Sequence, residues 1–300
     1  MTTEPHGPVD ATSGIGFTAF GVTAARAVQT SGDDPLVVDP YAAAFVNAAV
    51  LPMPMPTSAH DVPPEDGLWQ RASLLVGLRS KYFDDYLRRS IDAGVRQVVL
   101  LAAGFDSRAY RLDWPPGTTV YELDLPDVLE FKHRVLAASG AQPRCVRRAV
   151  AVDLQDPWAA ALTEAGFDRE QPTAWVGEGL LMYLSAAVGS ALVETVHSLS
   201  APGSTVGLEQ FGIPEATLQD SGADEPVTEL LNERSTLLPS APYGDPAEQL
   251  STAGWTVEVR KGPELAERYN RSLSGELAST YRRDEYYLTG RLGGVRPSER

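Results

Sequence analysis

A chain of 300 residues with 43% apolar residues can bury a core without help from disulfides or metal, and its single cysteine, Cys145, can form no internal disulfide. The formal net charge of −15 opposes binding to nucleic acid or anionic membranes. No basic segment precedes an apolar core at the start of the chain, and no apolar run approaches the roughly 20 residues that span a bilayer. We therefore expect a cytoplasmic monomer or homodimer without a metal site and without nucleic-acid or membrane partners.

Residues 1–94 are predicted to form a helical cover that precedes the first strand. Apolar residues recur at helical spacing over 15–28, and five prolines within 51–64 predict an irregular loop. Residues 68–93 then carry apolar side chains at three- and four-residue steps, which predicts one long helix with Arg79 near its middle.

Residues 95–300 are predicted to form the core, because strands and helices alternate regularly there. The expected strands cover 97–102, 118–123, 144–151, 173–178 and 204–210. This alternation is typical of a Rossmann-like, doubly wound α/β sheet that is mostly parallel. Segments near 255–260 and 285–291 predict a closing antiparallel hairpin, and 213–244 is expected as an insert, either a solvated helical segment or a lid beside the active site.

Acidic residues stand at the ends of most of these strands. Ligands bind outside the carboxyl ends of the strands in such sheets, so these positions predict a site. Glu122, followed by Leu123, lies 18 residues after Gly104, which is the spacing at which an acid bonds ribose hydroxyls. Asp124 stands at the end of the same strand, and the other strand ends carry Ala103, Gly104, Asp106, Asp153, Leu154, Glu178, Gly179 and Glu209.

The predicted ligand is a nucleoside without phosphate groups. The turn after the first strand has neither the G-x-G-x-x-G nor the G-K-[ST] pattern that holds a pyrophosphate. An edge lined with carboxylates would also repel phosphates but attract a cation, which favours S-adenosylmethionine as the cofactor. An NAD-binding oxidoreductase and a non-catalytic binding protein on the same topology remain as alternatives.

Four motifs resemble the leucine carboxyl methyltransferase-like family, which includes protein phosphatase carboxyl methyltransferases, polyketide O-methyltransferases and many actinobacterial members. They occupy residues 100–108, 121–126, 152–154 and 178–184. The resemblance runs over residues 14–290 and implies the class I methyltransferase fold with S-adenosylmethionine as cofactor.

The resemblance also implies roles for residues around the methionine part of the cofactor. Arg79 would pair with its carboxylate, Gly104 would let it approach the backbone, and Glu178 would face its ammonium group. The phosphatase-type members use a lysine in the N-terminal cover. No lysine occurs in the part of the cover before the long helix predicted at 68–93, and Arg26 is the nearest substitute.

For the nucleoside part, the resemblance implies that Glu122 holds the ribose and that Asp153 and Leu154 contact the adenine. Tyr183, within the last motif, is expected beside the cofactor as well.

No obvious general base appears among the four histidines, which fall in the N-terminal tail, the proline-rich loop and predicted helices. A carboxylate acceptor is already ionised at pH 7 and needs no base. Tyr183, Glu209 and Tyr82 are candidates for positioning the acceptor. We therefore expect an S-adenosylmethionine-dependent O-methyltransferase acting on a carboxylate or acidic hydroxyl of a small molecule, such as a polyketide or other secondary metabolite, with protein carboxyl methylation as the alternative.

Overall fold

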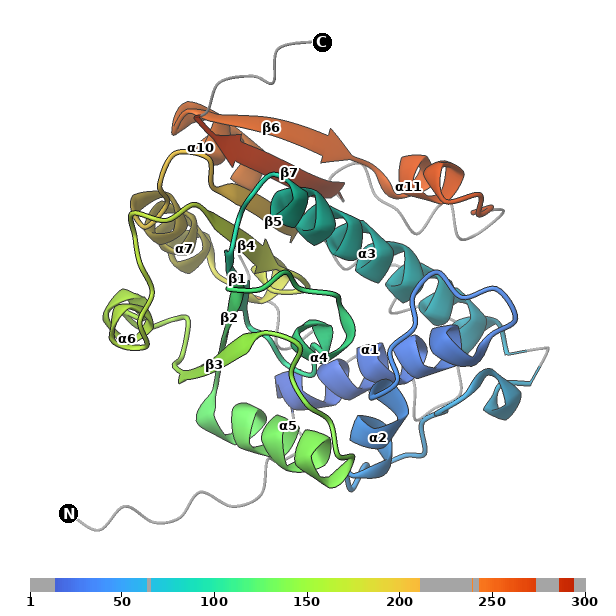
Figure 1. Cartoon of the computed structure of the whole chain (residues 1–300). Helices are drawn as coiled ribbons and strands as arrows, with labels where there is room; N and C mark the ends of the chain where they lie inside the picture. The colour runs from blue at the N-terminus through green and yellow to red at the C-terminus, as the bar shows by residue number, and fades with distance from the viewer. Residues whose placement is uncertain (1–13, 64–65, 211–238, 240–242, 274–285, 294–300) are drawn as a thin grey trace.

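The computed structural model describes the chain outside residues 1–13, 64–65, 211–238, 240–242, 274–285 and 294–300 (Figure 1). Most of the predicted insert at 213–244 therefore lies outside the described residues. Within the described ranges, no helix combines the length and the apolar character that crossing a membrane requires.

The described N-terminal part is helical, as the sequence predicts. Its elements are α1 (Gly14–Ser31), α2 (Ala42–Asn47), the short 3-10 helix η1 (Ala59–Asp61) and α3 (Gly67–Asp92). The long helix α3 begins at Asp66, because one carboxylate oxygen of this residue accepts the backbone N–H groups of Leu68 and Trp69. It ends before Gly94, whose φ of +97° lies in the left-handed region.

The described strands form one sheet in the order β3-β2-β1-β4-β5-β7-β6. They are β1 (Gln97–Leu101), β2 (Thr119–Asp124), β3 (Val146–Ala151), β4 (Thr173–Gly177), β5 (Thr205–Gln210), β6 (Trp255–Arg260) and β7 (Tyr286–Leu292). Strands β1 to β5 pair in parallel, whereas β7 pairs antiparallel with β5 and with β6. This confirms the predicted doubly wound, mostly parallel sheet. The last two strands are neighbours but no tight hairpin, since a helix lies between them in the chain (Figure 1).

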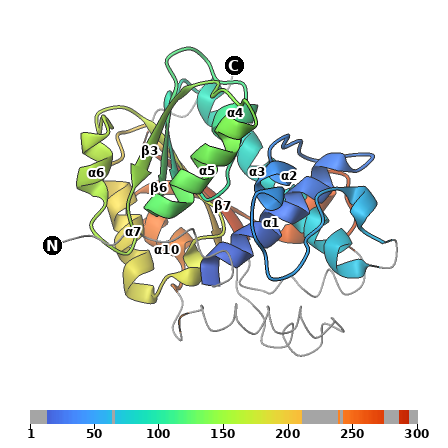
Figure 2. The same cartoon turned by 90° about the horizontal axis from the view of Figure 1, so that it is seen from below.

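Helices cover both faces of the sheet (Figures 1 and 2). The remaining helices are α4 (Arg108–Arg111), α5 (Pro126–Ala138), α6 (Ala159–Glu164), η2 (Leu181–Tyr183), α7 (Ala186–Ser198), α10 (Pro246–Thr252) and α11 (Gly262–Arg268). On one face, buried side chains of α1, α3 and α5 pack together, among them Phe20, Phe83 and Phe131. On the other face, α6, α7 and α10 bury Leu162, Leu192 and Leu250 against the sheet.

The strand order reverses between β1 and β4, which lie side by side with Leu101 paired to Gly177. The loops that follow these two strands lead to opposite faces of the sheet, so a crevice forms between them. Helix α1 lies against the first loop, because the ring of Phe20 packs 4.6 Å from that of Phe105. The fold thus places an N-terminal helix at the end of the sheet where a ligand is expected.

Candidate cofactor site

A cavity of about 240 Å³ opens at this reversal of strand order, and we call it the switch-point cavity. Its walls come from residues 102–106 after β1, from Glu178 and Gly179 after β4, and from one face of α1. The start of α5 contributes Leu125 and Val128. The structure therefore brings the predicted strand ends and the N-terminal helical cover together around one cavity.

The turn after β1 has an unusual backbone. Gly104 has a φ of +43°, and Ala102, which has a Cβ, has a φ of +50°. A non-glycine residue in this region costs roughly 1–2 kcal/mol and is commonly found where a binding site depends on the turn. Asp124 secures the turn, because its Oδ2 accepts the N–H of Gly104 at 2.6 Å while its Oδ1 accepts the N–H of Leu125 at 2.7 Å.

Asp124, and not Glu122, is the acid of β2 that lines the cavity. Glu122 is completely buried, and its Oε2 lies 2.9 Å from Lys132 Nζ and 2.6 Å from Arg147 Nη2. The reason is the length of the strand: β2 continues to Asp124, so Glu122 still lies inside the sheet. Glu122 therefore does not line the cavity, and its position gives no support to the prediction that it holds a ribose. Leu123 also lies outside the lining, because its side chain is buried in the core of the opposite face.

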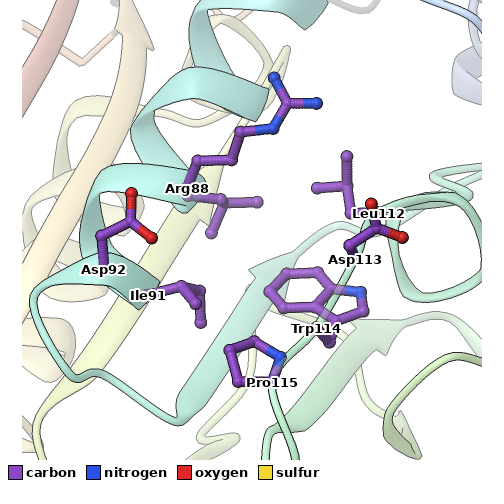
Figure 3. A pocket seen from close by; sticks show the side chains of 8 residues that line it. Arg88, Ile91, Asp92, Leu112, Asp113, Trp114 and Pro115 are labelled. Carbon is purple, nitrogen blue, oxygen red and sulfur yellow. The ribbon is translucent and has the colours of Figure 1, made fainter.

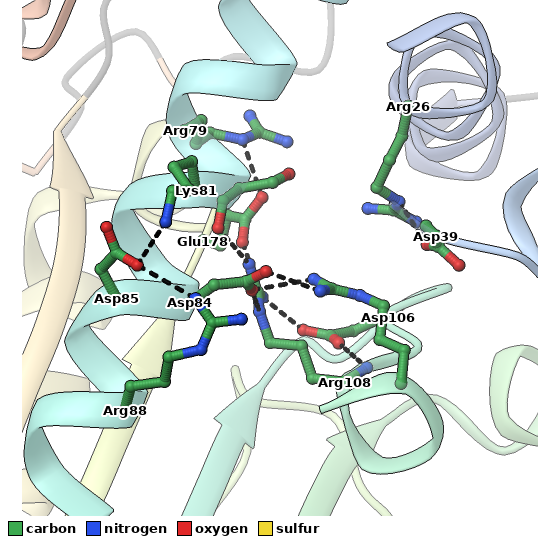
Figure 4. A network of polar contacts seen from close by, with 12 residues as sticks. Arg26, Asp39, Arg79, Lys81, Asp84, Asp85, Arg88, Asp106, Arg108 and Glu178 are labelled. Atoms are coloured by element: carbon green, nitrogen blue, oxygen red, sulfur yellow. Dashed lines mark hydrogen bonds and ion pairs between the residues drawn. The ribbon is translucent and has the colours of Figure 1, made fainter. Parts of the chain in front are cut away.

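Two carboxylates of the cavity share one buried arginine (Figure 4). Arg108 Nη1 lies 2.6 Å from Asp106 Oδ2 and 2.8 Å from Glu178 Oε2. Burial has the largest single effect and raises the pKa of both acids, but for Asp106 the charges of Arg108, Lys132 and Arg111 together outweigh it and hold the pKa at about 2. Arg108 and then Arg79 likewise hold the pKa of Glu178 below its ordinary value. Both acids are therefore carboxylates at neutral pH.

Arg79 reaches the cavity from the middle of α3, where the sequence predicts it. Its Nε donates to Glu178 Oε1 at 2.8 Å, and its Nη1 lies 3.4 Å from Glu209 Oε2. Glu209 is buried behind the lining and also accepts the N–H of Gly179 at 2.8 Å, where the backbone has a φ of +64°. Glu209 thus holds Arg79 and the second loop in place without lining the cavity itself.

Helix α1 brings Arg26 to the cavity wall. The guanidinium of Arg26 lies 2.7 Å from Asp39 Oδ2 and donates to the carbonyl of Phe105 at 2.9 Å, which joins the N-terminal helices to the turn after β1. The hydroxyl of Tyr183 donates to that of Thr18 at 3.3 Å and so joins α1 to the loop after β4. Both predicted residues, Arg26 and Tyr183, therefore lie at the cavity.

Three other predicted residues do not reach it. Asp153 and Leu154 follow the edge strand β3, and a carboxylate oxygen of Asp153 accepts the N–H of Gln155 in its own turn. Tyr82 is buried against the ring of Tyr287, with ring centroids 5.4 Å apart. Its side chain fills the space between α3 and β7, so this position gives no support to the prediction that it positions an acceptor.

Several lining residues were missed by the sequence analysis. They are Thr18, Ala19, Val22, Thr23, Ala102, Leu125, Val128 and Met182. Asp124 was predicted at the strand end but without a role, and placing the strand end one residue later would have singled it out. The α1 residues gave no such signal, because a helical repeat of apolar residues does not show what it faces.

A second cavity, of about 320 Å³, lies between the end of α3 and the segment before β2 (Figure 3). Arg88 and Asp92 on one side and Trp114 on the other contribute to its lining. These segments lead into the amino ends of β1 and β2, so this cavity lies away from the strand ends that carry the acids. In the part of the chain that the structure describes, no group of three His, Cys, Asp or Glu side chains could hold a metal ion.

The sheet topology and the acid-lined switch-point cavity are those of a class I methyltransferase. A family model for leucine carboxyl methyltransferases matches residues 19–197, and the chain belongs to this family. A relative from Mycobacteroides abscessus is 47% identical over 269 residues, covering 87% of this chain and 86% of the relative. One from Saccharopolyspora erythraea is 42% identical, covering 88% and 91%. Both are described as "Putative S-adenosyl-L-methionine-dependent methyltransferase".

A solved structure from Thermobifida fusca, described as that of a "putative methyltransferase", shares the fold with a TM-score of 0.54 at 18% identity, covering 98% of this chain and 100% of that one. The chain is therefore an S-adenosylmethionine-dependent methyltransferase, which confirms the predicted family, the predicted methyl transfer and the predicted cofactor. The NAD-binding alternative is wrong.

The cavity fits a cationic nucleoside on its own chemistry. Asp106, Asp124 and Glu178 offer carboxylate oxygens to a sulfonium, an ammonium or hydroxyl groups, while Arg26 and Arg79 offer cations to a carboxylate. The left-handed turn at Gly104 presents a backbone without a side chain to the ligand.

Proposed function

We propose that this methyltransferase transfers the methyl group to a carboxylate or an acidic hydroxyl of a small molecule, such as a polyketide or another secondary metabolite. The observation that carries the proposal is the set of titratable side chains in the described lining: arginines, carboxylates and Tyr183. The acids that Arg108 holds ionised are weak bases, and the described histidines, His60, His133 and His197, lie outside the lining. An acceptor that is ionised at neutral pH suits such a site, because it needs no base.

When bound, S-adenosylmethionine supplies an electrophilic methyl group on a sulfonium. For the nucleoside, Asp124 is the acid placed to accept hydrogen bonds from ribose hydroxyls, since it combines a cavity-facing position with a fixed carboxylate. For the methionine part, Arg79 would pair with the carboxylate and Glu178 would face the ammonium group.

The acceptor would enter between α1 and the loop after β4. Apolar side chains from both segments, Val22 and Met182, line this part of the cavity together with Tyr183. An apolar wall excludes water from the reacting atoms, and alignment of an ionised oxygen with the methyl group can supply much of the rate acceleration. The covering helix also favours a small acceptor over the C-terminus of a folded protein.

The test is transfer of a labelled methyl group to a panel of aromatic and aliphatic carboxylic acids, acidic phenols and a peptide with a C-terminal leucine. Methyl esters release volatile methanol in alkali, whereas aryl methyl ethers do not, so the product type is read directly. We expect turnover of acids or phenols at pH values above their own pKa. Exclusive methylation of the peptide, or of amines and neutral alcohols, would contradict the proposal.

A further inference from the structure

Arg108 is a buried cation that touches the acids of the cavity without lining it. It is 3% exposed and opens α4 immediately after the turn that follows β1. Its Nη1 bridges Asp106 Oδ2 and Glu178 Oε2, at 2.6 Å and 2.8 Å, which come from the loops after β1 and β4 (Figure 4). One guanidinium nitrogen therefore links the loop after β1 to the loop after β4, which form two walls of the switch-point cavity.

We propose that Arg108 is a positioning residue that holds Asp106 and Glu178 together as a pair of carboxylates for the cationic cofactor. The inference concerns cofactor binding alone and is independent of which acceptor is methylated.

The guanidinium of Arg108 is itself fixed by partners on α3. Its Nε lies 2.7 Å from Asp84 Oδ1, and its Nη2 donates to the carbonyl of Ser80 at 3.4 Å. Arg111 Nη1 binds the other oxygen of Asp84 at 2.6 Å, so Asp84 is held as well. These contacts hold the guanidinium against α3, while its Nη1 faces the two cavity acids.

The local charge balance gives the reason for such an arrangement. The charged groups that face the two acids come from α1, α3, α4, α5 and β5: Arg26, Arg79, Asp84, Arg111, Lys132 and Glu209. Arg26 is balanced by Asp39, and Lys132 lies against Glu122. The remaining ion-paired cluster joins three arginines, Arg79, Arg108 and Arg111, to four acids, Asp84, Asp106, Glu178 and Glu209, hence one negative charge in excess. Asp124 adds a further carboxylate to the lining. S-adenosylmethionine, with two cationic groups and one carboxylate, carries a net positive charge that such an excess attracts.

Without Arg108 the same cluster would carry two excess negative charges in a buried space. Asp106 and Glu178 both lie within 2.8 Å of one nitrogen, so their carboxylates are close neighbours. Two carboxylates that share a buried site do not both ionise near neutral pH, and the pKa of one of them rises strongly. The cavity would then take up a proton and lose attraction for a cation.

The experiment measures the dissociation constant of S-adenosylmethionine by calorimetry at pH 6 and pH 8 for the wild type and for Arg108→Gln. For each protein we divide the dissociation constant at pH 6 by that at pH 8, and then divide the ratio of the variant by the ratio of the wild type. The second division removes the effect of the ligand's own amine, which titrates in both experiments. A carboxyl group whose pKa rises to about 7 is about nine-tenths protonated at pH 6, so we expect the relative ratio to increase about tenfold.

Arg111→Gln is the matched control. Arg111 is a buried arginine of the same helix with the same partner, Asp84, and in the described structure it forms no ion pair with the two cavity acids. Its charge lowers the pKa of Asp106 without a direct contact, so we expect Arg111→Gln to lower stability and to change the pH ratio much less than Arg108→Gln does. Arg108→Lys keeps the positive charge but loses the planar guanidinium that can contact several acids at once. We therefore expect its pH ratio to lie between those of the wild type and Arg108→Gln. An equal loss of affinity at both pH values in Arg108→Gln, or the same pH effect in Arg111→Gln, would overturn the inference.

A second measurement serves if Arg108→Gln folds poorly. The double variant Arg108→Gln/Glu178→Gln removes one positive and one negative charge together, so we expect it to resist urea better than Arg108→Gln alone. A double variant no more stable than the single one would show that Arg108 does not act by compensating this acid, and would also overturn the inference.

Discussion

Replacing Glu122 should damage folding and leave cofactor binding intact, whereas replacing Asp124 should mainly weaken cofactor binding, with a smaller loss of stability from the turn that it holds. The two acids lie two residues apart on β2, so they offer a matched pair of substitutions, Glu122→Gln and Asp124→Asn. Glu122 and Lys132 are both 0% exposed, and Arg147 completes the buried group. Asp124 lines the cavity and binds the N–H of Gly104.

Removing one partner of a buried ion pair costs about 3–5 kcal/mol, because the other charge stays buried without compensation. With an unfolding entropy of about 2.1 cal/mol/K per residue, this lowers the melting temperature of the 300-residue chain by roughly 5–8 °C. Asp124→Asn removes the charge of the carboxylate that we expect to accept hydrogen bonds from the ribose. Hydrogen bonds to a charged group are worth about 1.5–3 kcal/mol, so the dissociation constant of S-adenosylmethionine should rise about tenfold or more.

Urea denaturation gives the stability of each variant, and calorimetry gives its affinity for S-adenosylmethionine and S-adenosylhomocysteine. A folded Glu122→Gln protein should bind both ligands with nearly wild-type affinity. The reasoning fails if Glu122→Gln weakens binding tenfold at unchanged stability while Asp124→Asn binds normally. That result would put the ribose at Glu122 and would mean that the switch-point cavity is not the nucleoside site.

Three further outcomes are expected. Arg79→Met should weaken the binding of S-adenosylmethionine about tenfold, since a charge-assisted pair contributes about 1.5–3 kcal/mol. The binding of 5′-methylthioadenosine, which lacks the carboxylate, should change less than about twofold. Equal losses for both ligands would indicate a structural arginine. The pKa values of Asp106 and Glu178 are lower in the folded protein than their ordinary values, so their stabilisation is complete above those values. The free energy of unfolding should therefore fall from about pH 4 towards pH 2 in urea titrations, and a flat profile would contradict this. Hydrogen exchange on adding S-adenosylhomocysteine should show protection of 14–64, with 213–244 responding less, because α1 lines the cavity; protection confined to the strand ends would make this cover merely structural.

The sequence by itself determined the sheet and the end of it that carries the site. Unbroken apolar runs alternate with helical repeats, which is enough to predict a doubly wound parallel sheet. Acids at the strand ends and the single glycine of the first turn then locate the ligand, because carboxyl ends of parallel strands meet at one edge. Gly104, Asp106 and Glu178 lie at the cavity for this reason, and Arg79 follows from the family resemblance.

Only the tertiary structure decided which neighbouring side chains face the ligand. A difference of one residue in the end of β2 separates Glu122 in the core from Asp124 at the cavity. The role of α1 and the bridging position of Arg108 depend on contacts between residues far apart in the chain, such as Arg108 with Glu178. Periodicity and spacing report on neighbours along the chain, whereas buried charges take their partners from packing across the sheet. For that physical reason the strand ends were predictable and their ion pairs were not.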